Sequence, residues 1–305
     1  MTLRNHQELL VALAILYFLA TSLPSVSAHG PYAWDGEATY KFTTYHPGQN
    51  YKGLSNVKNY FHHLGYIPNA PHFDDNFDDT LVSAIKTYQK NYNLNVTGKF
   101  DINTLKQIMT PRCGVPDIII NTNKTTSFGM ISDYTFFKDM PRWQAGTTQL
   151  TYAFSPEPRL DDTFKSAIAR AFSKWTPVVN IAFQETTSYE TANIKILFAS
   201  KNHGDPYPFD GPGGILGHAF APTDGRCHFD ADEYWVASGD VTKSPVTSAF
   251  DLESVAVHEI GHLLGLGHSS DLRAIMYPSI PPRTRKVNLA QDDIDGIRKL
   301  YGINP

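Results

Sequence analysis

Hydrophobic positions recur at intervals of three and four between residues 54 and 109, which predicts amphipathic helices. We expect three of them, over residues 54–66, 79–92 and 101–109. Gly65 is a natural stop for the first helix, and Asp101 a natural cap for the third. Each helix has one apolar face to bury, so this region is predicted to form a small three-helix bundle.

The second half of the chain contains both the alternation of a strand and the spacing of a helix. Residues 150–154 alternate as in a strand, and residues 181–183 and 193–198 are also strand-like. Helical spacing is found over residues 162–175 and again over 289–302. We therefore expect an α+β fold in this half.

The charge balance adds little, but the N-terminus is informative. The chain has 305 residues, 41% of them hydrophobic, and a formal charge of −4, which suits one or two domains. It has no basic stripe for nucleic acid and no polybasic patch for a membrane.

Residues 1–28 have a positive start, an apolar run and a small-x-small end at Ala28, so we expect a cleaved secretory signal. A membrane anchor is the alternative, but this run is short for a span and no later stretch is long enough.

The densest chemistry lies between residues 258 and 268. His258 and His262 are four residues apart, so on a helix they share one face and can bind one ion. Gly265 and Gly267 then allow the turn that brings His268 back. Three imidazoles leave one tetrahedral position open, as in a catalytic zinc site. Glu259 points into the same cleft without binding the metal.

A second group of metal ligands lies in a glycine-rich loop and the sequence after it. Three histidines and one aspartate form a closed tetrahedral set, which predicts a structural zinc: His203, Asp205, His218 and His228. The six histidines that follow Cys113 are all used by the two proposed zinc sites.

Cys113 lies in a segment, residues 111–117, whose two prolines and glycine disfavour regular structure. We expect an extended strip in which a thiolate can fill the open position on the zinc and exclude water. Arg112 and Asp117 are close enough in sequence to hold the strip with an ion pair. A disulfide from Cys113 to Cys227 is the alternative, and we assign Cys227 no role.

These motifs resemble a known family. The pattern H-E-x-x-H-x-x-G-x-x-H, followed by Met276 in the turn at residues 274–278, is similar to the metzincin endopeptidases. The heptad P-R-C-G-V-P-D at residues 111–117 resembles the cysteine switch of matrix metalloproteinases (matrixins), and residues 84–101 resemble the peptidoglycan-binding-like bundle of their propeptides. Among them, the chain looks most like the minimal plant-type secreted members that lack a haemopexin domain.

The resemblance implies a metzincin-type catalytic domain of α+β class, with a twisted, mostly parallel sheet and long helices, preceded by the propeptide bundle. The implied divisions are a signal peptide (1–28), a helical propeptide (29–110), a cysteine-switch strip (111–117), an activation linker (118–140) and a zinc metalloprotease domain (141–305).

The resemblance also implies further sites. At least one calcium ion would be bound by carboxylates and by backbone carbonyls of Asp210, Gly211, Gly213, Ile215, Asp230 and Glu233. Residues 216–220 would pair with an extended substrate, and small Ser254 would leave a deep pocket for Leu-like side chains. The Asp292–Asp293 pair would receive the new N-terminus after activation, or would only favour the helix dipole.

The implied function is that of a secreted zinc endopeptidase made as a latent zymogen, acting on extracellular proteins in the apoplast or matrix. Zinc-bound water would attack the peptide bond with Glu259 as general base, while Met276 shapes the base of the metal site. Another protease or self-cleavage near residues 129–140 would activate a monomeric enzyme. Asn95 and Asn123 begin possible glycosylation sequons. Two alternatives stay open: a protein that binds wall polysaccharide through the bundle, and a catalytically silent zinc protein.

Overall fold

The structure is a computed structural model that describes residues 39–303, except 69, 71, 119, 122–123 and 126–132. The expected signal peptide and the sequon at Asn123 lie outside the described residues, as does part of the segment expected to be cleaved on activation.

The N-terminal part is the expected three-helix bundle. After a short 3-10 helix, η1 (Lys41–Thr44), it consists of α3 (Leu54–His63), α4 (Asp79–Asn91) and α5 (Ile102–Ile108). Asp78 and Asp101 cap α4 and α5 by accepting the backbone N–H groups of Leu81 and Thr104. Helix α3 ends earlier than predicted because the chain turns at Gly65, whose φ is +87°.

The C-terminal part is built on a six-stranded sheet with the order β1-β8-β9-β7-β5-β6. Its neighbouring strands are all parallel except the β8–β9 pair, so the predicted mostly parallel sheet is confirmed. The strands of this sheet are β1 (Arg112–Cys113), β5 (Gln149–Phe154), β6 (Ala182–Glu185), β7 (Ile194–Ala199), β8 (Ile215–Ala219) and β9 (Arg226–Asp230).

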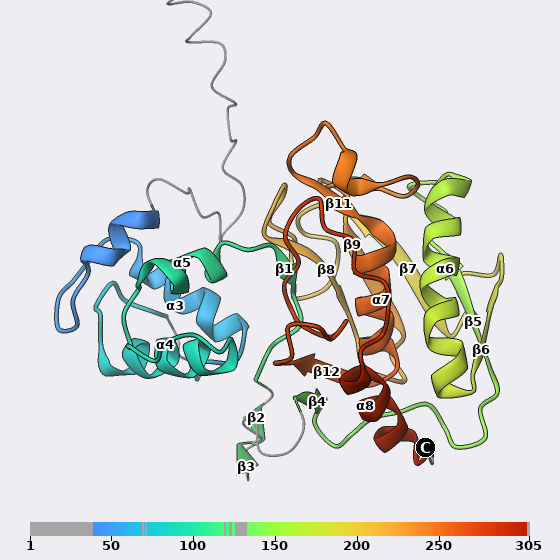
Figure 1. Cartoon of the computed structure of the whole chain (residues 1–305), viewed down its shortest axis with the longest axis horizontal. Helices are drawn as coiled ribbons and strands as arrows, with labels where there is room; N and C mark the ends of the chain where they lie inside the picture. The colour runs from blue at the N-terminus through green and yellow to red at the C-terminus, as the bar shows by residue number, and fades with distance from the viewer. Residues whose placement is uncertain are drawn as a thin grey trace, which may run out of the picture.

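Three helices accompany the sheet: α6 (Asp162–Val179), α7 (Leu252–Leu263) and α8 (Gln291–Tyr301). All residues of α7 are buried, so this helix lies inside the core rather than on its surface. Trp175 of α6 is completely buried, and its indole N–H donates to the Val257 carbonyl of α7 at 2.8 Å. Helix α7 thus lies against the sheet, with α6 beside it (Figure 1).

Short paired strands complete the described structure. β4 (Tyr134–Phe136) pairs antiparallel with β12 (Leu266–Ser269), and β10 (Tyr234–Val236) pairs parallel with β11 (Ala249–Asp251). A 3-10 helix, η2 (Val241–Lys243), lies near β11, and β2 (Ile120–Asn121) pairs with β3 (Lys124–Thr125). β4 falls within the stretch expected to be an activation linker, so part of that stretch is built into the C-terminal part.

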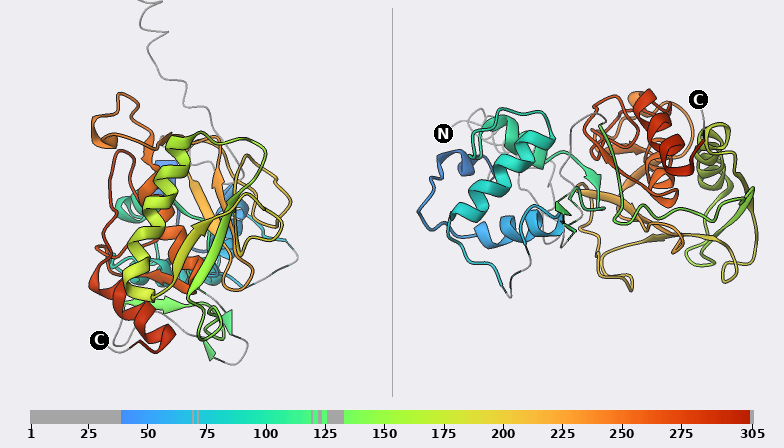
Figure 2. Two further views of the ribbon diagram at one scale, coloured as in Figure 1. Left: turned by 90° about the vertical axis from the view of Figure 1, so that its right-hand side faces the viewer. Right: turned by 90° about the horizontal axis from the view of Figure 1, so that it is seen from below.

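The bundle and the C-terminal part lie side by side and have separate hydrophobic cores (Figure 2). Strand β1 runs between them, so the predicted switch strip separates the bundle from helix α7 (Figure 1). Tyr277, from the C-terminal part, is packed into the core of the bundle. The bundle is therefore docked over the region that carries the histidines.

Candidate metal centre

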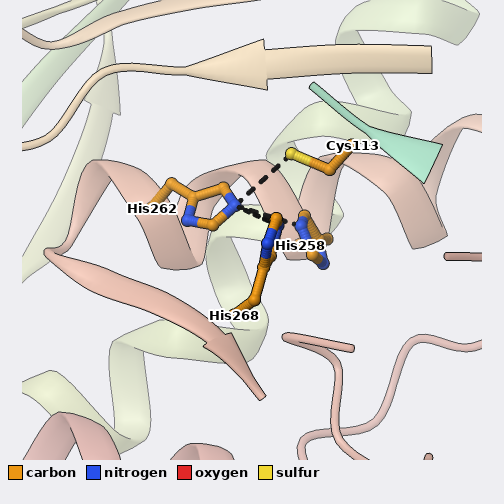
Figure 3. A group of neighbouring side chains, drawn as sticks. All are labelled: Cys113, His258, His262 and His268. Carbon is orange, nitrogen blue, oxygen red and sulfur yellow. Dashed lines mark hydrogen bonds between the residues drawn. The ribbon is translucent and has the colours of Figure 1, made fainter. Parts of the chain in front are cut away.

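Helix α7 and the turn after it bring three histidines together. His258 and His262 are one helical turn apart, and β12 returns His268 to the same point. The turn needs glycine at position 265, where φ is +104° and a Cβ would lie 2.2 Å from the Pro141 carbonyl oxygen. The expected convergence of the three side chains is what the structure shows (Figure 3).

The ring nitrogens of these histidines almost touch. His262 Nε2 lies 3.1 Å from His258 Nε2 and 3.2 Å from His268 Nε2. Cys113 Sγ is 3.4 Å from His262 Nε2, although the two residues are 149 positions apart in the sequence. All four side chains are buried, and their ligand atoms lie within 4.8 Å of one another.

The opposite ring nitrogens identify the protonation of the histidines. Nδ1 of His258 and of His262 lie 2.7 and 2.8 Å from the carbonyl oxygens of Ile275 and Leu266. Nδ1 of His268 lies 2.8 Å from a carboxylate oxygen of Asp117. Carbonyl and carboxylate oxygens accept, so each Nδ1 carries the hydrogen and each Nε2 presents a lone pair.

Three lone pairs pointing at one another in a buried site require a cation between them. Burial lowers the pKa of all three histidines, so the cation is not a proton on the rings. Burial, reinforced by the Glu259 carboxylate, also raises the pKa of Cys113, so a thiolate here needs a metal ion. Three neutral imidazoles and one thiolate are donors suited to zinc, and the residues therefore fit the implied metal.

Glu259 lies beside this cluster and is not used for structure. It is completely buried, and no N–H or O–H group of the described residues donates to either of its carboxyl oxygens. Burial raises the pKa of Glu259 to about 8. A carboxyl group kept free of partners next to a metal-type site is available to exchange protons.

Met276 lies against the other side of helix α7. A Cβ at Gly261 would lie 2.2 Å from the Met276 sulfur, so glycine at this position lets the methionine pack under the histidines. Asp293 supports this turn, because its carboxylate accepts the N–H groups of Ile275 and Met276 at 2.8 and 3.0 Å.

The strip that carries Cys113 occupies the edge of the sheet. β1 pairs in parallel with β8, with Cys113 opposite Gly217. The Gly114 N–H donates to the Gly217 carbonyl at 2.8 Å, and on the other side the Cys113 N–H donates to the Pro278 carbonyl at 2.9 Å. The strip is therefore bonded on both sides, at the strand where a substrate was expected to pair.

The bundle holds the strip through a buried ion pair. Arg112 contacts Asp117 with both terminal nitrogens, at 2.6 and 3.0 Å, and each side chain is only 2% exposed. Tyr92 accepts from Arg112 at 2.7 Å and lies 3.3 Å from Asp117, to which its hydroxyl donates. Tyr66 donates to the same carboxylate at 2.8 Å. The expected ion pair is present, and the bundle supplies two tyrosines around it.

The second predicted zinc group also comes together. Asp205 Oδ2 lies 3.1 Å from His203 Nε2, 2.9 Å from His218 Nε2 and 2.8 Å from His228 Nδ1. The residues come from the loop after β7 and from β8 and β9, all within the C-terminal part. This cluster has four protein donors of its own and no contribution from the strip.

The predicted calcium residues lie together less tightly than either zinc-type cluster. Asp210, Asp230 and Glu233 are buried and form no ion pair among the described residues. Burial, together with repulsion from neighbouring carboxylates, raises their pKa values to about 7, 6 and 8. Their oxygens accept N–H groups of Ile215, Gly211 and Gly213, which places the loop around them. Their carboxyl oxygens do not form a cluster as compact as the two histidine groups.

The remaining predicted residues are placed as follows. Cys113 and Cys227 are both free and buried, so the alternative of a disulfide between them is not supported. Ser254 lines a pocket beside His258 and Glu259, together with Leu216, Val255, Ile275, Tyr277 and Ile280. Asp292 accepts the N–H groups of Asp133 and Tyr134 and the hydroxyl of Ser269.

Comparison with known proteins agrees with this geometry. The family model described as Matrixin, of the M10 peptidases, matches residues 142–302. This chain belongs to the matrixin family. A second model, described as a putative peptidoglycan binding domain, matches residues 50–108, which span the bundle helices.

Several relatives of this matrixin cover most of its length. Metalloendoproteinase 2-MMP of Arabidopsis thaliana is 46% identical over 97% of this chain and 83% of its own length. Metalloendoproteinase 5-MMP of the same organism is 49% identical over 90% of this chain and 77% of its own. Human matrix metalloproteinase-20 is 34% identical over 96% of this chain and 54% of its own. The matrixin is accordingly a zinc-dependent metalloendopeptidase.

Sequence reasoning missed two features of this matrixin's site. It paired Asp117 with Arg112 but did not place it beside His268, which is 151 residues away. It did not connect Tyr66 and Tyr92 of the bundle with the ion pair of the strip. No local pattern signals these contacts, because they form only when the bundle docks.

Proposed function

We propose that this matrixin is made as a latent zymogen in which Cys113 closes the metal site. The observation that carries the proposal is the position of Cys113 Sγ, 3.4 Å from His262 Nε2 in a cluster with three histidines. A zinc ion bound by four protein ligands has no position for water, so the chain in this arrangement would be inactive. Activation then requires that the strip leave.

The mechanism assigns each residue one task. His258, His262 and His268 would hold a zinc ion, which supplies polarisation of the scissile carbonyl and lowers the pKa of a water toward about 7. Glu259 takes the proton of the attacking water on a carboxyl oxygen and returns it to the nitrogen of the leaving amine. Met276, in contact with Gly261 of α7, would shape the base of the metal site.

The substrate would take the place of the strip at β8. An extended peptide would pair with the backbone of residues 216–220, where Gly217 now accepts from Gly114. The pocket lined by Leu216, Val255 and Ile275 is mainly apolar. Because Ser254 is small, we expect this pocket, once the strip has left, to take a Leu-like side chain just after the cleaved bond.

Further parts of the proposal concern the ions and the setting of the enzyme. His203, Asp205, His218 and His228 would hold a structural zinc, and the loop around Asp210, Asp230 and Glu233 at least one calcium ion. The enzyme would be secreted, glycosylated at its sequons, monomeric and active on extracellular proteins, after cleavage by another protease or by itself. Among the described residues, no helix has the length and apolar character needed to cross a membrane.

The rival of a polysaccharide-binding bundle receives little support from its aromatic residues. Tyr88 is completely buried and Tyr92 is 4% exposed. Tyr92 is also engaged with Arg112 and Asp117. Such side chains are not available to stack on a sugar, so they support a role in core packing and in holding the strip.

The test is hydrolysis of a quenched peptide containing Gly-Leu by the purified full chain. Activity is measured before and after a thiol-reactive mercurial, with and without a zinc chelator. We expect activity to appear with the mercurial and to vanish with the chelator. A chain that binds zinc but stays silent under every condition would contradict the proposal, and saccharide binding by that chain would then support the rival function.

A further inference from the structure

The three histidines of the metal centre differ in what supports them. His258 and His262 donate their Nδ1 hydrogens to backbone carbonyls of Ile275 and Leu266, which belong to the C-terminal part. His268 donates to a carboxylate oxygen of Asp117, which belongs to the strip. Two of these supports are therefore permanent, whereas the third would leave with the strip.

The Asp117 carboxylate is well suited to orient a metal ligand. Both terminal nitrogens of Arg112 contact its oxygens, at 2.6 and 3.0 Å, and Tyr66 and His268 each approach it at 2.8 Å. The group is thus paired with a buried guanidinium and held in one orientation. A carboxylate that accepts the distal N–H of an imidazole fixes its tautomer and makes the other nitrogen a better donor to a metal.

The two atoms that the strip brings to the site are close in sequence. Cys113 and Asp117 are four residues apart, and Arg112 joins them. Its Nε donates to the Cys113 carbonyl at 2.8 Å, and its terminal nitrogens donate to Asp117. One segment therefore delivers a metal ligand and the support of another ligand together. Its departure would remove both at once.

We propose that Asp117 is a positioning residue for His268, and that the docked strip strengthens zinc binding through Asp117 as well as through Cys113. The inference rests on the proposed zinc site and latency. Because coupling between two binding events is reciprocal, zinc would also strengthen docking of the strip through His268. The propeptide would then help the enzyme to acquire and keep its zinc, besides blocking the site.

The test separates this role from that of the thiol. Full-length chains carrying Cys113→Ser are compared with and without Asp117→Asn or Asp117→Ala, and their zinc dissociation constants are measured by chelator competition. Loss of the carboxylate should weaken zinc binding by about 10- to 100-fold, the usual effect of removing such a support. With two zinc sites the competition curve should have two phases, and the phase that disappears in His262→Ala belongs to this site. The phase of the second cluster should be the same in every variant.

Tyr66→Phe is the matched control. Tyr66 donates to the other oxygen of the same carboxylate at 2.8 Å, the distance at which His268 approaches the first. This variant loosens the strip but leaves the contact with His268, so zinc binding should change less than about threefold. An equal loss in Tyr66→Phe and in the Asp117 variants would overturn the inference in favour of a purely structural role.

Proton NMR gives a readout that needs neither activity nor added metal. The three Nδ1 hydrogens are buried and hydrogen-bonded, so they should give separate low-field signals in the full chain. Asp117→Ala should abolish the His268 signal and leave the other two. Loss of all three would instead show a misfolded variant, and Asp117→Asn, which keeps the size of the side chain, then decides through zinc affinity.

The outcomes also separate this inference from the proposed function. If His262→Ala removes no zinc from the full chain, the metal site itself is wrong. If His262→Ala removes zinc but the Asp117 variants bind it as tightly as Cys113→Ser alone, only the role of Asp117 is refuted.

Discussion

The two histidine clusters of this matrixin use similar donors but are built differently. The cluster of His203, Asp205, His218 and His228 takes all four donors from one part of the chain. The cluster of His258, His262 and His268 takes its fourth donor, Cys113, from a strip held by a separate bundle. A site with four fixed donors can only hold an ion, whereas a site with one removable donor can be opened for chemistry.

The surroundings of the clusters show the same difference. Glu259, to which no N–H or O–H group of the described residues donates, lies beside the removable cysteine. In the other cluster, the carboxylate of Asp205 is itself among the donors, at 2.8 to 3.1 Å from three histidines. The carboxylate of Glu259 can therefore transfer protons, whereas that of Asp205 would serve as a metal ligand. The predictions below test this contrast.

The largest effect is expected for Glu259→Gln. This variant should keep both zinc equivalents but lose about two to four decades in kcat, because the general base is gone. Activity is measured on the processed enzyme with the quenched peptide, and zinc by elemental analysis. Glu253→Gln, on the same helix but paired with Arg170 and Arg285, is the control and should retain most of the rate. Near-normal turnover by Glu259→Gln would contradict the assignment of Glu259 as the general base.

His228→Ala should lower the free energy of unfolding by about 3 kcal/mol in the presence of zinc. A ligand present at 100 times its dissociation constant contributes about 2.7 kcal/mol, and this contribution is lost with the site. The measurement is urea denaturation together with the zinc content, which should fall by one equivalent. His46→Ala, at an exposed position outside both clusters, should change neither value. Unchanged stability and zinc content in His228→Ala would argue against a structural zinc.

Cys113→Ser should make the unprocessed chain active without a mercurial. We expect its rate to exceed that of the unprocessed wild type at least about tenfold, since a loss of only about 1.4 kcal/mol in strip binding has that effect. Cys227→Ser is the matched control, because Cys227 is also buried and free but lies in β9 and is not among the ligand atoms of either cluster. It should remain latent. Latency in Cys113→Ser, or release in Cys227→Ser, would contradict the role of the strip.

The smallest effect concerns the predicted calcium site around Asp210, Asp230 and Glu233, whose proposed ligands include no histidine. Asp210, Asp230 and Glu233 have pKa values raised by burial to about 7, 6 and 8. The folded chain therefore keeps protons that the unfolded chain has released. Without calcium, the free energy of unfolding due to these groups should fall as the pH rises from about 4 toward 8.

Calcium should reverse this loss at pH 8, because the ion replaces the protons on the carboxylates. We expect the melting temperature at pH 8 to rise by a few degrees on adding calcium, since about 1 kcal/mol corresponds to roughly 2–4 °C in a domain of this size. Asp210→Asn should reduce the response, while Asp232→Asn, at an exposed neighbour, should not. An equal response in both variants would place calcium elsewhere.

The local parts of this protein follow from short-range patterns in the chain. Spacing of apolar residues predicted the bundle helices to within a few residues, and Asp101 was correctly expected to cap α5. The four-residue interval between His258 and His262 fixes their common face, because one helical turn is 3.6 residues long. Both groups of proposed zinc ligands could be named in this way, since donor type and spacing are written in the chain.

The tertiary structure alone decided how distant segments complete the site. The contact between Cys113 and His262 spans 149 residues, and that between Asp117 and His268 spans 151. The hydrogen bonds of Tyr66 to Asp117 and of Tyr92 to Arg112 likewise depend on docking of the whole bundle. Such contacts follow from the shape and burial of large surfaces, which no short stretch of sequence encodes. Local geometry thus specified the metal ligands, and long-range packing specified which of them can leave.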